Sequence, residues 1–213
     1  MRIDHDGISL EAQVFGRSGR PLVLIMGIGA QLVHWPVGFC EALVEAGFQV
    51  LRFDNRDAGL STWLDDEAAP DLRQGLLRRV AGLQVAAPYT LLDMAKDTLG
   101  ILDHMGWSQA HVVGASMGGM VAQELAIHHR DRVASLTSIM STTGARRHAW
   151  ARPAAVRALM APASRTAEEA EQRSVELMAA IGGSLERDEV ELRRTARAAF
   201  ERAALVDFQV PFN

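Results

Sequence analysis

Apolar and polar positions along the chain predict strands that alternate with helices. Residues 8–15 alternate loosely with period two, as expected of a strand with one exposed face. Residues 21–26 form a continuous apolar run that ends at Gly27, which is typical of a strand buried on both faces. Residues 39–46 have helical spacing and stop at Gly47, which predicts a helix with a glycine cap.

The same alternation continues toward the middle of the chain. The further elements that the pattern predicts are a strand over 48–53, a helix capped by Thr90 that runs to Met105, a strand over 110–113, a helix over 117–128 and a strand over 133–140. Strands separated by helices predict an α/β fold, in which a mostly parallel central sheet carries helices on both faces.

The composition changes after Gly144, where only helical patterns remain. They are rich in alanine and arginine and break near Pro162 and at Gly182-Gly183. We therefore expect three parts: a core over 1–144, a helical cap over 145–206, and the start of a further core strand over 207–213.

Charge, cysteine content and hydropathy argue against several kinds of site and partner. The net charge is −4 and the arginines form no long run, which argues against a nucleic-acid partner. Cys40 is the only cysteine, so an intramolecular disulfide or a thiolate metal cluster is excluded, and its helical setting predicts a partly buried apolar side chain. The apolar run over 21–33 is shorter than the roughly 20 residues of a membrane span, so we expect a cytoplasmic protein without a membrane partner.

The strongest chemical signal is the segment Gly114-Ala115-Ser116-Met117-Gly118, between a predicted strand and a predicted helix. Such a turn holds a serine in a strained conformation with its hydroxyl exposed, and needs small neighbours because two backbones meet there. The helix N-terminus directs amides and a positive dipole end at the reacting centre. Ser116 is therefore the predicted nucleophile, and the backbone amide of Met117 a predicted oxyanion donor; the alternative is a purely structural turn.

A second oxyanion donor is expected from the loop Met26-Gly27-Ile28-Gly29, which follows an earlier central strand. The amide of Ile28 is the candidate. Two alternatives are a simple glycine turn and a dinucleotide-binding fold, because Gly27-x-Gly29 with Asp54 after the next strand imitates the Rossmann fingerprint. Against the second, the third glycine position is Leu32, and Trp35-Pro36 interrupts the helix that should bind phosphate.

The chain resembles the α/β-hydrolase superfamily in three segments. They are the glycine loop Gly27-Ile28-Gly29, the stretch Phe53-Asp54-Asn55-Arg56-Asp57-Ala58-Gly59-Leu60-Ser61 and the serine turn Gly114-Ala115-Ser116-Met117-Gly118. Within this superfamily the chain is similar to bacterial esterases of the aclacinomycin methylesterase group. The resemblance implies a small-molecule ester substrate, an acyl-serine intermediate and no cofactor. It also implies a structural role for Asp54, Arg56 and Ser61. Many members have histidine where this chain has Met26.

In this superfamily an acid and then a histidine are expected after the serine. The histidine removes the proton of the serine hydroxyl, and the acid orients the histidine. After Met140 the sequence continues Ser141-Thr142-Thr143, without an acid. Of the seven histidines, His34 near the oxyanion loop and His148 are the remaining candidates to face the site. No histidine has metal-ligand spacing, so no metal is predicted.

Residues 207–213 resemble the start of the next central strand, so we expect the chain to lack the last strands, the acid and the histidine. The predicted function is hydrolysis of carboxylic esters by Ser116, impaired or dependent on a partner chain; the alternative is an inactive binding module of the same fold. An uncovered edge at 133–140 would favour self-association.

Overall fold

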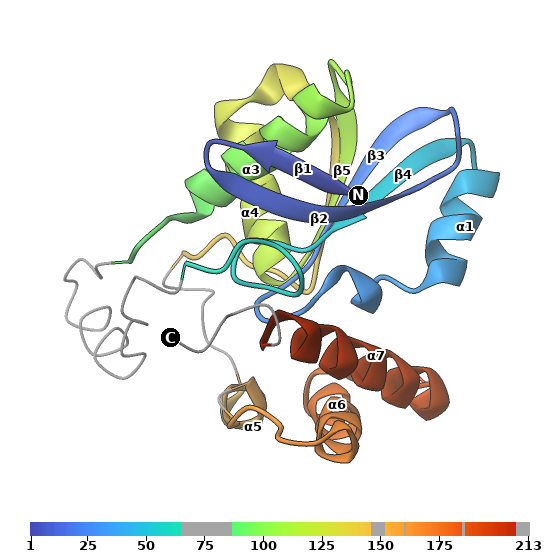
Figure 1. The fold of residues 1–213 in the computed structure, drawn as a ribbon, viewed down its shortest axis with the longest axis vertical. Helices are drawn as coiled ribbons and strands as arrows, with labels where there is room; N and C mark the ends of the chain where they lie inside the picture. Colours follow the sequence, from blue (N-terminus) through green and yellow to red (C-terminus); the bar gives the residue numbers. More distant parts are fainter. Residues whose placement is uncertain (65–86, 146–151, 160, 185, 208–213) are drawn as a thin grey trace.

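The computed structural model describes residues 1–64, 87–145, 152–159, 161–184 and 186–207. Its centre is a six-stranded sheet with the order β1-β2-β4-β3-β5-β6 (Figure 1). The strands are β1 (Arg2–His5), β2 (Ile8–Phe15), β3 (Arg20–Ile25), β4 (Phe48–Phe53), β5 (Ala110–Ala115) and β6 (Val133–Ile139). Strand β2 pairs antiparallel with β1 and β4, whereas the pairings among β3, β4, β5 and β6 are parallel. The predicted α/β class with a mostly parallel sheet is confirmed.

Helices cover both faces of this sheet. Among the described residues, the helices that pack on it are α1 (Val37–Glu45) on one face and α3 (Leu91–His104) and α4 (Met117–His128) on the other, with the short 3-10 turns η1 (Leu32–His34) and η2 (Arg130–Arg132) beside them. Val23 and Ile25 of β3 belong to the core under α3 and α4, and Leu22 and Leu24 to the core under α1. Residues 22–25 of β3 are buried on both faces of the sheet, which agrees with the continuously apolar sequence of the strand after Arg20.

The local patterns predicted most of these elements with errors of one or two residues. The predicted cap of α3 is confirmed, since the Asp93 amide donates to Oγ1 of Thr90 over 3.3 Å. Strand β1 was not predicted, because only Ile3 within it is buried and one apolar position makes no pattern. The prediction that Cys40 is partly buried was wrong: its side chain is fully enclosed, and burial raises the pKa of the thiol.

After Gly144 the described part of the chain contains helices alone: α5 (Pro153–Leu159), α6 (Ala167–Ile181) and α7 (Glu189–Asp207). Helices α6 and α7 pack side by side, and α7 reaches the loop that contains η1 (Figure 1). The division of the chain at residues 144 and 206 stays a prediction. No helix within the described ranges is both long and apolar enough to cross a membrane.

Candidate functional site

Ser116 occupies the turn between β5 and α4. Its φ of 54° and ψ of −119° lie in a region that residues other than glycine rarely adopt. Holding a residue in such a backbone conformation costs about 1–3 kcal/mol. The Ser116 amide donates to the carbonyl of Ile139 over 2.8 Å, and its carbonyl accepts from the Gly119 amide over 3.0 Å. Helix α4 begins at Met117, so the serine side chain projects from the turn at the N-terminus of that helix, where it is partly exposed.

Glycines beside this serine are required by close backbone contacts. A Cβ atom added at Gly114 would lie 2.2 Å from the carbonyl oxygen of Gly118. One added at Gly118 would lie 2.2 Å from the carbonyl oxygen of Ile25 in β3. Distances this short are not tolerated, so the predicted need for small residues on both sides of Ser116 is confirmed.

The loop after β3 passes directly beside the serine. A Cβ atom added at Gly27 would lie 3.0 Å from Cβ of Ser116. Asn55 fixes the start of this loop by donating from Nδ2 to the Met26 carbonyl over 2.9 Å. Ile28 follows and is exposed, with 64% of the residue's surface accessible. The structure therefore brings the two predicted segments together, while the roles of Ser116 and of the Ile28 and Met117 amides stay predictions.

The helix that follows this loop begins too late for the dinucleotide alternative. Helix α1 starts at Val37 with Pro36 as its cap, and η1 intervenes after the glycines. A phosphate-binding glycine turn opens directly into a helix whose amides bind the phosphate. The loop at Gly27 therefore lacks the defining feature of that site.

The loop after β4 braces the site, as the resemblance implied. Asp54 is fully buried, and the Ser61 hydroxyl donates to its carbonyl over 2.6 Å. Arg56 reaches α3 and donates from two nitrogens to the carboxylate of Asp97, over 2.6 and 2.7 Å. Both partners are largely removed from solvent, which makes this bidentate pair a rigid link between the loop and α3.

Among the described residues, no side chain hydrogen-bonds to Oγ of Ser116, so none of them is identified as its general base. Nδ1 of His34 lies 3.1 Å from both the amide and the carbonyl oxygen of Gln31. Burial lowers the pKa of His34, which favours a neutral ring. His148 lies outside the described residues. Likewise, no group of three or more histidine, cysteine or acidic side chains gathers as a metal site in the described ranges.

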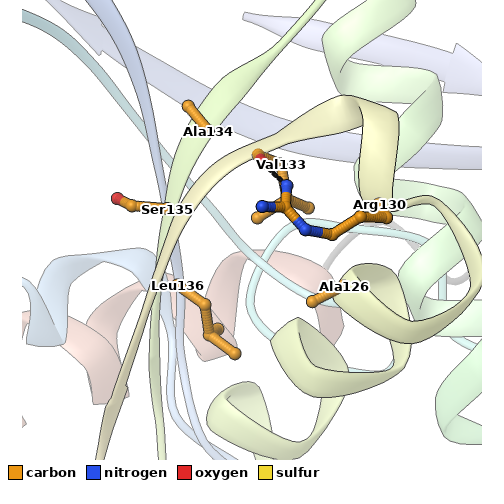
Figure 2. Close-up of a pocket in the computed structure, with 6 residues that line it drawn as sticks. All are labelled: Ala126, Arg130, Val133, Ala134, Ser135 and Leu136. Carbon is orange, nitrogen blue, oxygen red and sulfur yellow. Dashed lines mark hydrogen bonds between the residues drawn. The ribbon is translucent and has the colours of Figure 1, made fainter.

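A pocket on the outer part of the sheet is separate from the serine. Figure 2 shows its lining, which is Ala126, Arg130, Val133, Ala134, Ser135 and Leu136. These residues of β6 belong to its beginning, whereas Ser116 contacts the last residue of the strand. The one charged lining residue, Arg130, donates to the Val133 carbonyl over 2.8 Å. This pocket is therefore not the candidate catalytic site.

The chain is similar in sequence to a known protein family and to an enzyme of Streptomyces. Residues 20–181 match the family described as alpha/beta hydrolase fold. The chain is 33% identical over 141 residues to the rhodomycin D methylesterase of Streptomyces peucetius, a match that covers 65% of this chain and 41% of that protein. Thus the chain spans about two fifths of the length of this relative.

Solved structures agree on the architecture. A hydrolase from Pseudomonas aeruginosa is similar with a TM-score of 0.54 and 26% identity, over 92% of this chain and 70% of that one. The enol-lactonase of Burkholderia xenovorans has a TM-score of 0.55 and 24% identity, over 93% and 73%. At 24% identity, the similarity to the enol-lactonase shows the fold alone.

Proposed function

Because the chain belongs to the alpha/beta hydrolase fold family, we propose that it hydrolyses small-molecule carboxylic esters through an acyl-serine intermediate on Ser116. The observation that carries the proposal is the strained turn that presents this hydroxyl at the N-terminus of α4. The methylesterase name of its Streptomyces relative favours an ester substrate over other acyl compounds.

The proposed reaction begins with attack of Oγ of Ser116 on the ester carbonyl carbon, forming a tetrahedral intermediate. The amides of Met117 and Ile28 donate to its negative oxygen, and the dipole of α4 favours the same charge. Collapse of the intermediate expels the alcohol, which takes up a proton, and leaves an acyl ester on the serine. Water then attacks this ester, releases the carboxylic acid and restores the hydroxyl.

The rate depends on the group that removes the serine proton. A serine hydroxyl is a weak nucleophile without a histidine, but an oxyanion site and substrate binding alone retain about a thousandfold acceleration over water. We therefore propose slow hydrolysis by the chain alone. A second chain that supplies the histidine would make the specific activity rise with protein concentration.

Hydrolysis of p-nitrophenyl butyrate tests this function. The Ser116→Ala variant is expected to lose the part of the activity that passes through the acyl-serine, and to keep at most the rate that the oxyanion amides and substrate binding supply by themselves. Ser108→Ala, which removes an exposed hydroxyl that makes no side-chain hydrogen bond within the described structure, serves as the matched control and should retain full activity. Equal activity of Ser116→Ala and the unchanged chain would remove the serine from the mechanism and favour the alternative, a binding module of the same fold.

A further inference from the structure

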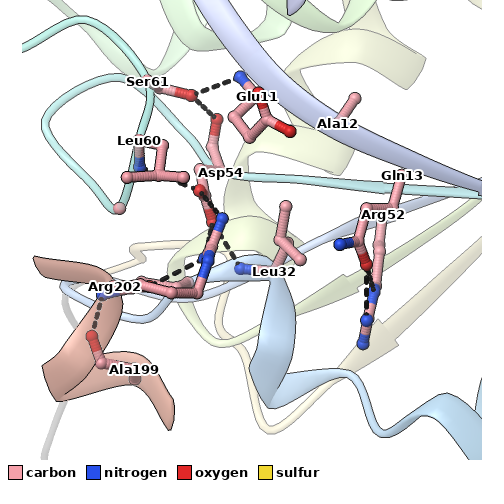
Figure 3. A network of polar contacts seen from close by, with 12 residues as sticks. Glu11, Ala12, Gln13, Leu32, Arg52, Asp54, Leu60, Ser61, Ala199 and Arg202 are labelled. Atoms are coloured by element: carbon pink, nitrogen blue, oxygen red, sulfur yellow. Dashed lines mark hydrogen bonds and ion pairs between the residues drawn. The ribbon is translucent and has the colours of Figure 1, made fainter. Parts of the chain in front are cut away.

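One carboxylate at the end of β4 joins three segments that are distant in the sequence. Asp54 is fully buried, and Figure 3 shows its contacts. Its Oδ1 accepts from the Leu32 amide over 2.6 Å, and its Oδ2 from the Leu60 amide over 3.0 Å. The guanidinium of Arg202, on α7, donates to Oδ2 over 2.8 Å and to Oδ1 over 3.3 Å. The side chain of Arg202 is 16% exposed, so water screens this pair little.

A second residue attaches the same loop to α7. Gln31 accepts from Nη1 of Arg202 over 2.8 Å through its Oε1. Its Nε2 donates to the Ala199 carbonyl over 2.8 Å, one turn earlier on the helix. Both ends of the Gln31 amide are therefore satisfied by α7. The helix is bound to the loop through two adjacent positions, Gln31 directly and Leu32 through Asp54.

These anchors lie immediately after the turn that passes Ser116. The amide of Ala30 donates to the Gly27 carbonyl over 3.3 Å and closes this turn around Ile28. Asn55 holds its first end through Met26, and the group of Gln31, Asp54 and Arg202 holds its second end. Glycines at two of its positions give the turn more conformational freedom than other residues would, so its geometry depends on these two attachments.

We propose that Arg202 is a positioning residue, which fixes the Ile28 amide relative to Ser116 by tying α7 to Gln31 and Asp54. This inference rests on the proposed function for its catalytic consequence, but its structural part does not. An oxyanion donor must be placed to within a fraction of an ångström to stabilise the transition state. Displacement of α7 would therefore change the site, although no residue of α7 takes part in the chemistry.

Hydrogen–deuterium exchange of the whole chain, read by mass spectrometry, tests the structural part. Arg202→Met keeps an unbranched apolar stem in place of the arginine stem and removes the guanidinium with its donors. Amides within residues 26–34 are expected to exchange about tenfold faster or more, because each hydrogen bond to a charged group is worth at least about that factor. Amides of residues 117–125, in α4, should not change and serve as the internal reference.

Arg197→Met is the matched control on the same helix. Arg197 pairs with Glu168 and Glu171 of α6 and makes no hydrogen bond or ion pair with the loop in the described structure, so its loss should leave exchange over 26–34 unaltered. Arg202→Lys, which keeps the charge but cannot span both Asp54 and Gln31, should lie between Arg202→Met and the unchanged chain. Unaltered exchange over 26–34 in Arg202→Met, or an equal rise in Arg197→Met, would overturn the proposal.

If Arg202→Met does not fold, the double variant with Asp54→Asn removes the unpaired buried charge and is judged by the same exchange. Ester hydrolysis supplies the second readout: kcat should fall in Arg202→Met while KM changes little. If the unchanged chain proves inactive, the proposed function fails, yet faster exchange over 26–34 would still support the positioning role. The two failures are thus distinguishable.

Discussion

The turn that carries Ser116 and the neighbouring strand β6 are adjacent in space but differ in how firmly they are enclosed. In the turn, the backbones of β3, β5 and α4 approach so closely that only glycine fits at Gly114 and Gly118. In β6, the five residues 134–138 are all exposed, and within the described sheet only β5 pairs with the strand. Strain in the serine backbone persists because the first region is fully packed, whereas nothing described restrains the outer side of the second.

The largest expected effect comes from breaking the close contact in the turn. Gly114→Ala would place a Cβ atom against the Gly118 carbonyl, and overpacking of this kind costs about 3 kcal/mol of unfolding free energy. Urea unfolding measures the loss. Gly38→Ala in α1 is the control, because no atom lies within 4 Å of its added Cβ and alanine favours a helix by about 1 kcal/mol. Similar losses in both variants would show that the turn is not specially packed.

The second prediction concerns the exposed strand. Strand β6 reads VASLTSI and so contains no charge or proline that would discourage pairing with another chain. We expect the 213-residue chain to self-associate at micromolar concentration, and Thr137→Lys on this strand to shift it toward the monomer. Sedimentation velocity measures both, and a stable monomer of the unchanged chain would contradict the expectation.

The smallest predicted effect is a pH dependence of the free energy of unfolding that comes from His34, the last residue of η1. Burial, its largest influence, lowers the pKa of this ring, so below about pH 6.5 the unfolded chain binds a proton that the folded chain does not. Stability should therefore fall as the pH drops below that value. His34→Gln should flatten this dependence when urea midpoints are compared between pH 7 and 5.5, and His104→Gln should not. An unchanged slope in His34→Gln would refute the assignment.

Local signals made the turn and most strands predictable, because a strand, a glycine-rich turn and a helix follow one another directly around Ser116. Strand β1 escaped prediction because its stability comes from pairing with β2 and not from its own pattern. The link between Arg202 and Asp54 was also missed. These residues are 148 positions apart, and nothing distinguishes Arg202 from the other arginines of its helix until α7 is packed against the loop.

Whether Ser116 is a nucleophile is decided by mapping the acyl group on the chain after reaction with an activated ester. The chain is incubated with excess p-nitrophenyl acetate, quenched in acid, digested and analysed by mass spectrometry. We expect one acetyl group per chain, carried by the peptide that contains Ser116 and absent from Ser116→Ala, with Ser108→Ala labelled like the unchanged chain. Acetylation at other residues alone, or to the same extent in Ser116→Ala, would contradict this expectation.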